Sequence, residues 1–262
     1  MTAKKPQSNC KPRTRLVKPA TSEPRVPGKV AVVTGGSRGI GYAIARALAA
    51  EGCAVVITGR NKSALKQSAA RLTKLQEPGM VVPIVCDVRD EKSVRALFTE
   101  VKRRFEKIDV LVNNAGITQP TVTVEETTLA LWHDVLDTNL TGTFLCTRAA
   151  LPMMRAGATI INNLSVAAKQ VFPKYATYSA AKRGALGFTL SLREELIPRG
   201  IRVVALMPGA TATDMWDQIM LDAPRDRMVK VENVAQAVLC AVLLPPGANL
   251  SELVLEPTGG AL

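Results

Sequence analysis

Histidine is almost absent from this chain, which has a single one, His133, in 262 residues. It lies beside Trp132 in a predicted helix, where a structural role is favoured over a catalytic one. The cysteines are odd in number, far apart and without a C-x-x-C pair, which favours reduced thiols over disulfides or a metal centre: Cys10, Cys53, Cys86, Cys146 and Cys240. Proton transfer in this protein must therefore use side chains other than histidine.

Long apolar runs are also missing. No stretch approaches the roughly eighteen residues that a membrane-spanning helix needs. Hydrophobic residues make up 47% of the chain and charged residues 21%, as in globular proteins with a sizeable core. With the reduced cysteines, this composition predicts a cytoplasmic protein without a membrane partner.

The positive charge is concentrated at one end. Residues 1–29 hold eight basic residues and one acidic residue, which is +7 of the net +12. The same stretch has five prolines and no aromatic residue, unlike the basic folded face of a nucleic-acid-binding protein. We interpret residues 1–27 as a solvated, flexible extension and residues 28–262 as one domain. The alternatives are a targeting segment, whose amphipathic helix the prolines would interrupt, and a contact with an anion or nucleic acid.

Short β-branched segments alternate with helical patterns from residue 28 onward. Strands are expected at 29–34, 54–58, 80–85, 109–112, 159–163, 201–206 and 253–255. Helices are expected at 40–50, 63–75, 91–105, 129–137, 140–154, 178–197 and 233–243. Continuously apolar strands joined by helices predict an α/β fold: a single-domain, doubly wound, Rossmann-like parallel sheet of about seven strands with helices on both faces.

A glycine-rich turn follows the first strand. Glycines at this place permit a tight turn and close backbone approach to a pyrophosphate, which then faces the positive end of the helix dipole. The strand–turn–helix context therefore favours dinucleotide binding. The predicted contacts from this turn are Gly35, Ser37, Arg38, Gly39, Ile40 and Gly41.

The end of the second strand indicates which nucleotide is bound. An NAD-binding protein usually has an acid there, which accepts from the ribose 2′-hydroxyl. Here the strand ends with Gly59 and Arg60, and Arg38 can approach the same 2′ position. Two guanidiniums without a carboxylate favour the 2′-phosphate of NADP(H). The alternative is that Arg60 is an ordinary solvated loop residue.

Tyr178 and Lys182 form the candidate acid–base pair. Positions i and i+4 share one helix face, so the phenol and the ammonium can point into the same cleft. A nearby ammonium is expected to lower the tyrosine pKa from about 10, making the phenol a usable general acid or base. Tyr175 lacks such a partner, because its i+4 residue is Ser179. We interpret Tyr175 as a packing residue at the cleft edge.

Taken together, these features resemble the short-chain dehydrogenase/reductase family over nearly all of residues 28–262. The matching motifs, in chain order, are the T-G-x3-G-x-G turn at 34–41, N-N-A-G at 113–116, Asn139, Ser165 thirteen residues before Tyr178, and Pro208-Gly209 followed by Thr213.

The resemblance implies a role for each matched residue. Tyr178 would pass a proton to the carbonyl oxygen that Ser165 holds. Lys182 would bind the nicotinamide ribose, and Asn139 would hold a water linking Lys182 to solvent. Further nucleotide contacts are implied at Asp87, Val88, Asn114, Ala115, Gly116, Pro208, Gly209, Thr211 and Thr213. The resemblance also implies a homodimer or homotetramer.

The resemblance leaves the substrate open. An NADP(H)-dependent carbonyl reductase or 3-hydroxy-acid dehydrogenase, acting on CH–OH donors, is favoured because residues 245–250 resemble such members. A 3-oxoacyl-thioester reductase is the main alternative. A non-enzymatic dinucleotide sensor is disfavoured, because it need not keep Ser165, Tyr178 and Lys182 together. Sugars, steroids and pterins are further substrate classes. The stretch between Thr213 and Val231 corresponds to a short lid.

Overall fold

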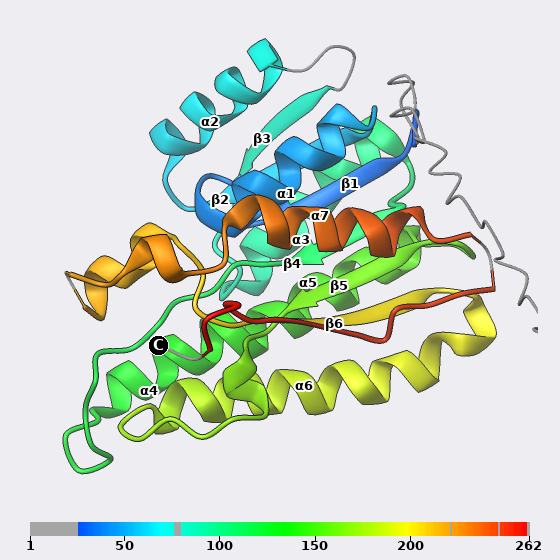
Figure 1. The fold of residues 1–262 in the computed structure, drawn as a ribbon. Coiled ribbons are helices and arrows are strands. Elements are labelled where there is room, and N and C mark those ends of the chain that lie inside the picture. The colour runs from blue at the N-terminus through cyan, green and yellow to red at the C-terminus, as the bar shows by residue number, and fades with distance from the viewer. Residues whose placement is uncertain (1–25, 76–79, 221, 246, 261–262) are drawn as a thin grey trace, which may run out of the picture.

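Seven parallel strands form one sheet in the order β3-β2-β1-β4-β5-β6-β7, which confirms the predicted fold class (Figure 1). The structure is a computed structural model that describes residues 26–75, 80–220, 222–245 and 247–260. The strands are β1 Val30–Thr34, β2 Ala54–Gly59, β3 Val81–Val85, β4 Val110–Asn113, β5 Thr159–Asn163, β6 Arg202–Pro208 and β7 Glu252–Leu255.

The central strands are apolar because both of their faces are covered. Every residue of β1 is buried, and successive side chains enter different cores. Val33 of β1 and Val204 of β6 belong to one core, whereas Val32 and Val203 belong to the other. Because both faces are buried, these strands do not alternate apolar and polar residues, and this pattern is what predicts a parallel sheet.

Helices cover both faces of the sheet. One core contains side chains of α1 Gly39–Ala50, α2 Lys62–Leu75 and α7 Val231–Leu243, and α1 lies alongside α7 (Figure 1). The other contains side chains of α3 Glu91–Phe105, α5 Gly142–Ala150 and α6 Ala176–Leu196. Helix α4, Leu129–Leu136, packs on α6. Within the described residues, every helix is too short or too polar to cross a bilayer.

The helix predicted at about 140–154 is α-helical only over Gly142–Ala150. A π-helical turn, Asp137–Thr141, joins α4 to α5, and α5 ends before a 3₁₀ turn at Leu151–Met153. The Asn139 side-chain amide donates to the Val135 carbonyl at 2.9 Å, the acceptor that an α-helix would give to the Asn139 N–H. The side-chain amide therefore occupies the acceptor of an α-helical backbone bond, and the helix forms a wider, π-helical turn here.

The remaining short elements are 3₁₀ helices: Val166–Ala168, Ile197–Arg199, Asp214–Gln218 and Arg225–Arg227. The predicted N-terminal extension needs one correction. Val26 is buried, and its N–H donates to the Glu51 carbonyl at 3.1 Å, so the folded part begins before residue 28. The rest of the extension, residues 1–25, lies outside the described residues.

The strand order reverses between β1 and β4. The chain runs from β1 outward to β3 and returns to β4 on the other side of β1. In open α/β sheets, ligands bind outside the carboxyl ends of the strands at such a reversal. The fold therefore places the binding site at the ends of β1 and β4.

Candidate active site

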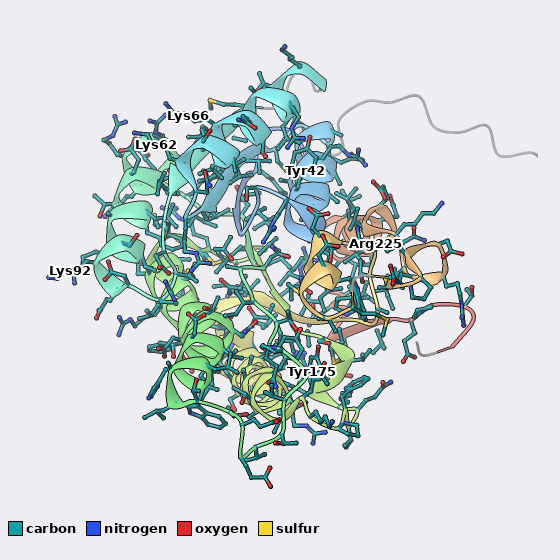
Figure 2. The ribbon with its side chains drawn as sticks, turned by 90° about the vertical axis from the view of Figure 1, so that its left-hand side faces the viewer. Tyr42, Lys62, Lys66, Lys92, Tyr175 and Arg225 are labelled. Atoms are coloured by element: carbon teal, nitrogen blue, oxygen red, sulfur yellow. The ribbon has the colours of Figure 1, made fainter. Side chains whose placement is uncertain are left out.

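A cavity of about 700 Å³ opens at the carboxyl ends of the central strands. Every residue that the sequence predicts to bind nucleotide or to act in catalysis lines it. Figure 2 labels Lys62 and Lys66 on α2 and Tyr175 at the start of α6, and both places contribute to the lining, through Ala64 and Tyr175. The segments that meet here come from nearly the whole length of the described chain.

The N-terminus of α1 forms one wall of this cavity. No side chain caps the helix, and its first turn has no acid, so its N–H groups and dipole favour an anion. Gly41 allows the turn to close, because a Cβ there would collide with Asn114 Nδ2 and the Gly35 carbonyl. Thr34 Oγ1, whose role the motif does not reveal, accepts from the N–H groups of Asn114 and Ala115 at 2.9 Å each.

Two arginines mark the nucleotide end. Arg38 and Arg60 are exposed, and neither guanidinium forms a salt bridge or hydrogen bond within the described part of the chain. Gly59 has room for a larger residue, since a Cβ there would lie 3.6 Å from the nearest atom, Ser37 Oγ. This end therefore offers two cations and no competing carboxylate at the end of β2.

Asp87 has a partner that the sequence analysis missed. Arg89 donates to the Asp87 carboxylate from Nε at 3.0 Å and from Nη2 at 2.6 Å, and it also pairs with Asp134 of α4. The Arg89 guanidinium holds the pKa of Asp87 below its usual range. Arg89 therefore fixes Asp87 as a carboxylate at the wall of the cavity.

Helix α6 brings Tyr178 and Lys182 to the cavity. The backbone N–H of Tyr178 donates to Gln119 Oε1 at 2.7 Å, so the loop after β4 sets where the first turn of α6 lies. Gln119 is 1% exposed, and no motif in the sequence singles it out. Lys182 is buried and donates from Nζ to the Asn163 carbonyl at 3.1 Å. Gln119 and Asn163 therefore position the candidate acid–base pair.

The expected lowering of the tyrosine pKa is wrong for this state of the protein. Burial raises the pKa of Tyr178 to about 12, and a hydrogen bond with Ser165 only partly offsets it. Burial also lowers the pKa of Lys182 to about 8. The Lys182 ammonium lies 5.5 Å from the Tyr178 ring centroid and is directed to a carbonyl instead. Tyr178 is thus a protonated phenol at neutral pH, a donor rather than a base.

Asn139 faces the same small space as Lys182. Its Oδ1 atom is buried and has no hydrogen-bond partner within the described residues. A Cβ on Gly116 would lie 2.7 Å from Asn139 Oδ1 and 3.6 Å from Lys182 Nζ, so glycine keeps this space open. A small polar molecule such as water could accept from the Lys182 ammonium and donate to Asn139 Oδ1 in this space.

The other end of the cavity is mainly apolar. The predicted lid folds as two short 3₁₀ helices, and Trp216 in the first donates from Nε1 to the Thr211 carbonyl at 2.9 Å. Gln170 and Glu256 add polar groups. The apolar lining consists of Ile117, Leu164, Val166, Phe172, Met215, Trp216 and Ile219.

Comparisons with known proteins agree with this geometry. Residues 29–223 match the sequence profile of the short chain dehydrogenase family. A 3-oxoacyl-[acyl-carrier-protein] reductase of Synechocystis is 38% identical over 88% of this chain and 96% of that protein. A farnesol dehydrogenase of Aedes aegypti is 33% identical over 88% of this chain and 97% of its own length. A Burkholderia cenocepacia short chain dehydrogenase, solved with NADP, matches 89% of this chain and 98% of its own, with 33% identity and a TM-score of 0.80.

Proposed function

This chain belongs to the short-chain dehydrogenase/reductase family, whose members use nicotinamide nucleotides, and we propose that it is an NADP(H)-dependent carbonyl/alcohol oxidoreductase with Tyr178 as proton donor. One observation carries the proposal: a single cavity joins an anion-binding helix end to Ser165, Tyr178 and Lys182. The substrate class is a small ketone or aldehyde, or the corresponding alcohol, with 3-hydroxy acids included.

The residues present fit an NADP(H) molecule. The uncapped N-terminus of α1 would hold the pyrophosphate, and the unpaired guanidiniums of Arg38 and Arg60 would hold the 2′-phosphate. The absence of an acid at Gly59 removes the group that would repel this phosphate. The relative from Burkholderia, solved with NADP, supports the same preference.

The protein's own side chains would handle the proton. When bound, the nicotinamide supplies or accepts the hydride at the substrate carbon. Tyr178, whose pKa of about 12 keeps it protonated, would donate its proton to the carbonyl oxygen, and Ser165 would hold that oxygen in place. A phenol that is protonated at neutral pH can supply the proton that reduction of a carbonyl requires.

Lys182 and Asn139 would return the proton to Tyr178. The ammonium lies beside the phenol, and the unpartnered Asn139 Oδ1 faces the same space at Gly116. A water bonded to both would connect Lys182 to solvent, so that Tyr178 is reprotonated after each reduction. Asn139 therefore acts as a positioning residue for this water.

A second candidate function is reduction of a 3-oxoacyl thioester. It is favoured by the Synechocystis relative, named as a 3-oxoacyl-[acyl-carrier-protein] reductase. The same side chains would act on the 3-oxo group, and the apolar end of the cavity would hold the acyl chain. The two candidates therefore differ in substrate and share the chemistry.

The nucleotide preference tests the proposal directly. With a panel of ketones, aldehydes and acetoacetyl thioesters, NADPH should give at least about tenfold higher kcat/KM than NADH, because charge-assisted bonds to the 2′-phosphate contribute about 1.5–3 kcal/mol. Nucleotide absorbance would follow turnover. Equal or better use of NADH would contradict the preference, and inactivity on the whole panel would contradict the reaction class.

The pKa of Lys182 sets an expected pH profile for reduction. The ammonium is present below about pH 8 and loses its charge as pH rises through this value, while Tyr178 stays protonated. The kcat/KM for NADPH, which reports the free enzyme, should therefore fall above about pH 8. Lys182→Arg, which stays charged, should have a flat profile at whatever level of activity it keeps. A flat wild-type profile would show that the lysine charge is not required.

We also propose the predicted homodimer or homotetramer and a cytoplasmic location. Phe144 of α5 is 40% exposed and lies edge-on to Phe188 of α6. Leu190 of α6 is 39% exposed. These exposed apolar side chains support an interface that covers α5 and α6.

A further inference from the structure

The two ends of the cavity carry opposite charge. Arg38 and Arg60 lie at the nucleotide end, where Arg89 pairs with the carboxylate of Asp87. Glu256 lines the cavity beside Gln170, in the segment that follows Ser165. Among the described lining residues, Lys182 is the one cation away from the nucleotide end, and it is buried. A substrate that enters the apolar end therefore meets the Glu256 carboxylate and no exposed cation among the described lining residues.

Glu256 is held at this wall by its backbone and its side chain. It directly follows β7, where the Gly209 N–H donates to the Leu255 carbonyl at 2.7 Å. A Cβ on Gly209 would lie 3.6 Å from Glu256 Cα, so the residue packs against the segment that follows β6. Its Oε1 atom accepts from Gln170 Nε2 at 2.7 Å. Because Glu256 is exposed, its carboxylate lies at the mouth of the cavity.

The cations around Glu256 are engaged elsewhere. Lys169, next to Gln170 in sequence, pairs with Glu252 instead. Arg183 donates to the Gln170 carbonyl at 3.1 Å. Within the described residues Glu256 forms no salt bridge, and its partner Gln170 is neutral. The charge of Glu256 is therefore uncompensated where a substrate would enter.

We infer that Glu256 determines specificity: it restricts the enzyme to uncharged carbonyl compounds with an apolar body and disfavours those with a carboxylate near the carbonyl. The inference rests on the proposed function and narrows its substrate class away from 3-hydroxy acids. A substrate carboxylate would meet like charge at the mouth and an apolar surface formed by Phe172, Trp216 and Ile219. Both disfavour an anion.

A matched pair of substrates tests this inference. Ethyl acetoacetate and acetoacetate carry the same 3-oxo group and differ in charge. The wild-type enzyme should have a higher kcat/KM for ethyl acetoacetate than for acetoacetate. Glu256→Gln should raise the ratio of kcat/KM for acetoacetate over the ester about fivefold, the size expected for a like charge close to solvent. Added salt should narrow the wild-type preference and have less effect in the variant, which a purely structural role of Glu256 would not produce.

Glu252→Gln is the matched control. Glu252 is the first residue of β7, the strand that Glu256 follows, and it also pairs with the segment after Ser165, but it does not line the cavity. This variant should keep the wild-type ratio. A wild-type preference for acetoacetate, or a Glu256→Gln ratio equal to that of Glu252→Gln, would overturn the inference.

A second readout separates this inference from the proposed function. If neither compound is reduced, the proposed reaction fails, yet both compounds can still be titrated into the enzyme–NADPH complex while nucleotide fluorescence is followed. Weaker binding of acetoacetate than of the ester, relieved by Glu256→Gln, would support charge selection by itself. Equal binding of the two would overturn it. If NADPH does not bind, the proposed nucleotide site is wrong, and the inference falls with it.

Discussion

Replacing Tyr178 by phenylalanine is expected to lower turnover roughly 10²–10⁴-fold, the usual contribution of a general acid. The substitution removes the hydroxyl and its bond with Ser165 but keeps the ring. The edge-to-face contact with Tyr175, with centroids 6.1 Å apart, and the backbone bond to Gln119 do not need the hydroxyl. NADPH affinity and melting temperature should therefore change little. Fluorescence titration and thermal unfolding would measure both beside the rate.

Tyr175→Phe is the control, because it removes the same atom from the neighbouring ring. The Tyr175 hydroxyl is buried and has no hydrogen-bond partner within the described residues. Its loss should leave the melting temperature unchanged or slightly higher, because burying an unpaired polar group costs stability. Turnover should stay within about twofold of wild type. The assignment fails if Tyr178→Phe keeps more than about a tenth of wild-type turnover with chemistry rate-limiting.

Gly59→Asp is expected to reverse the nucleotide preference, with about a hundredfold change in the NADPH-to-NADH ratio of kcat/KM. The new carboxylate would repel the 2′-phosphate and accept from the 2′-hydroxyl of NADH. The structure has room for it, since a Cβ at this position would lie 3.6 Å from Ser37 Oγ. Steady-state kinetics with both nucleotides on one substrate would measure the change.

Gly59→Asn separates charge from bulk in this experiment. Asparagine has nearly the same size and no charge, so it should lower NADPH use far less than aspartate. If the two variants behave alike, bulk at the end of β2, rather than repulsion of a phosphate, controls the preference. If neither changes the ratio, the 2′-phosphate does not bind beside Gly59.

The fold and the residues around the cavity could be predicted because they follow from short-range patterns. Burial on both faces makes β1 and β6 continuously apolar, so the parallel sheet is evident in the sequence. The glycine turn and the spacing from Tyr178 to Lys182 depend on residues a few positions apart. Such local geometry needs no knowledge of how distant segments pack.

The features that the sequence did not predict depend on burial and on distant partners. The spacing of Tyr178 and Lys182 leads us to expect a lowered tyrosine pKa. Burial of Tyr178 raises this pKa instead, and it outweighs any effect of the lysine. Gln119 is 59 positions from the N–H that it binds, and Glu256 is 86 positions from Gln170. The π-helical turn depends on an Asn139 rotamer that no periodicity encodes.

The long-range hydrogen bonds around the cavity also bear on how the protein folds. The bond from the Asn114 N–H to Thr34 spans 80 positions, and the bond from the Tyr178 N–H to Gln119 spans 59. Contacts between distant segments form slowly, because chain entropy is lost before they stabilise anything. Helices can therefore form in a refolding chain before Tyr178 and the nucleotide cradle meet. Recovery of catalytic activity would then mark the last step of folding, well after the return of helical circular dichroism.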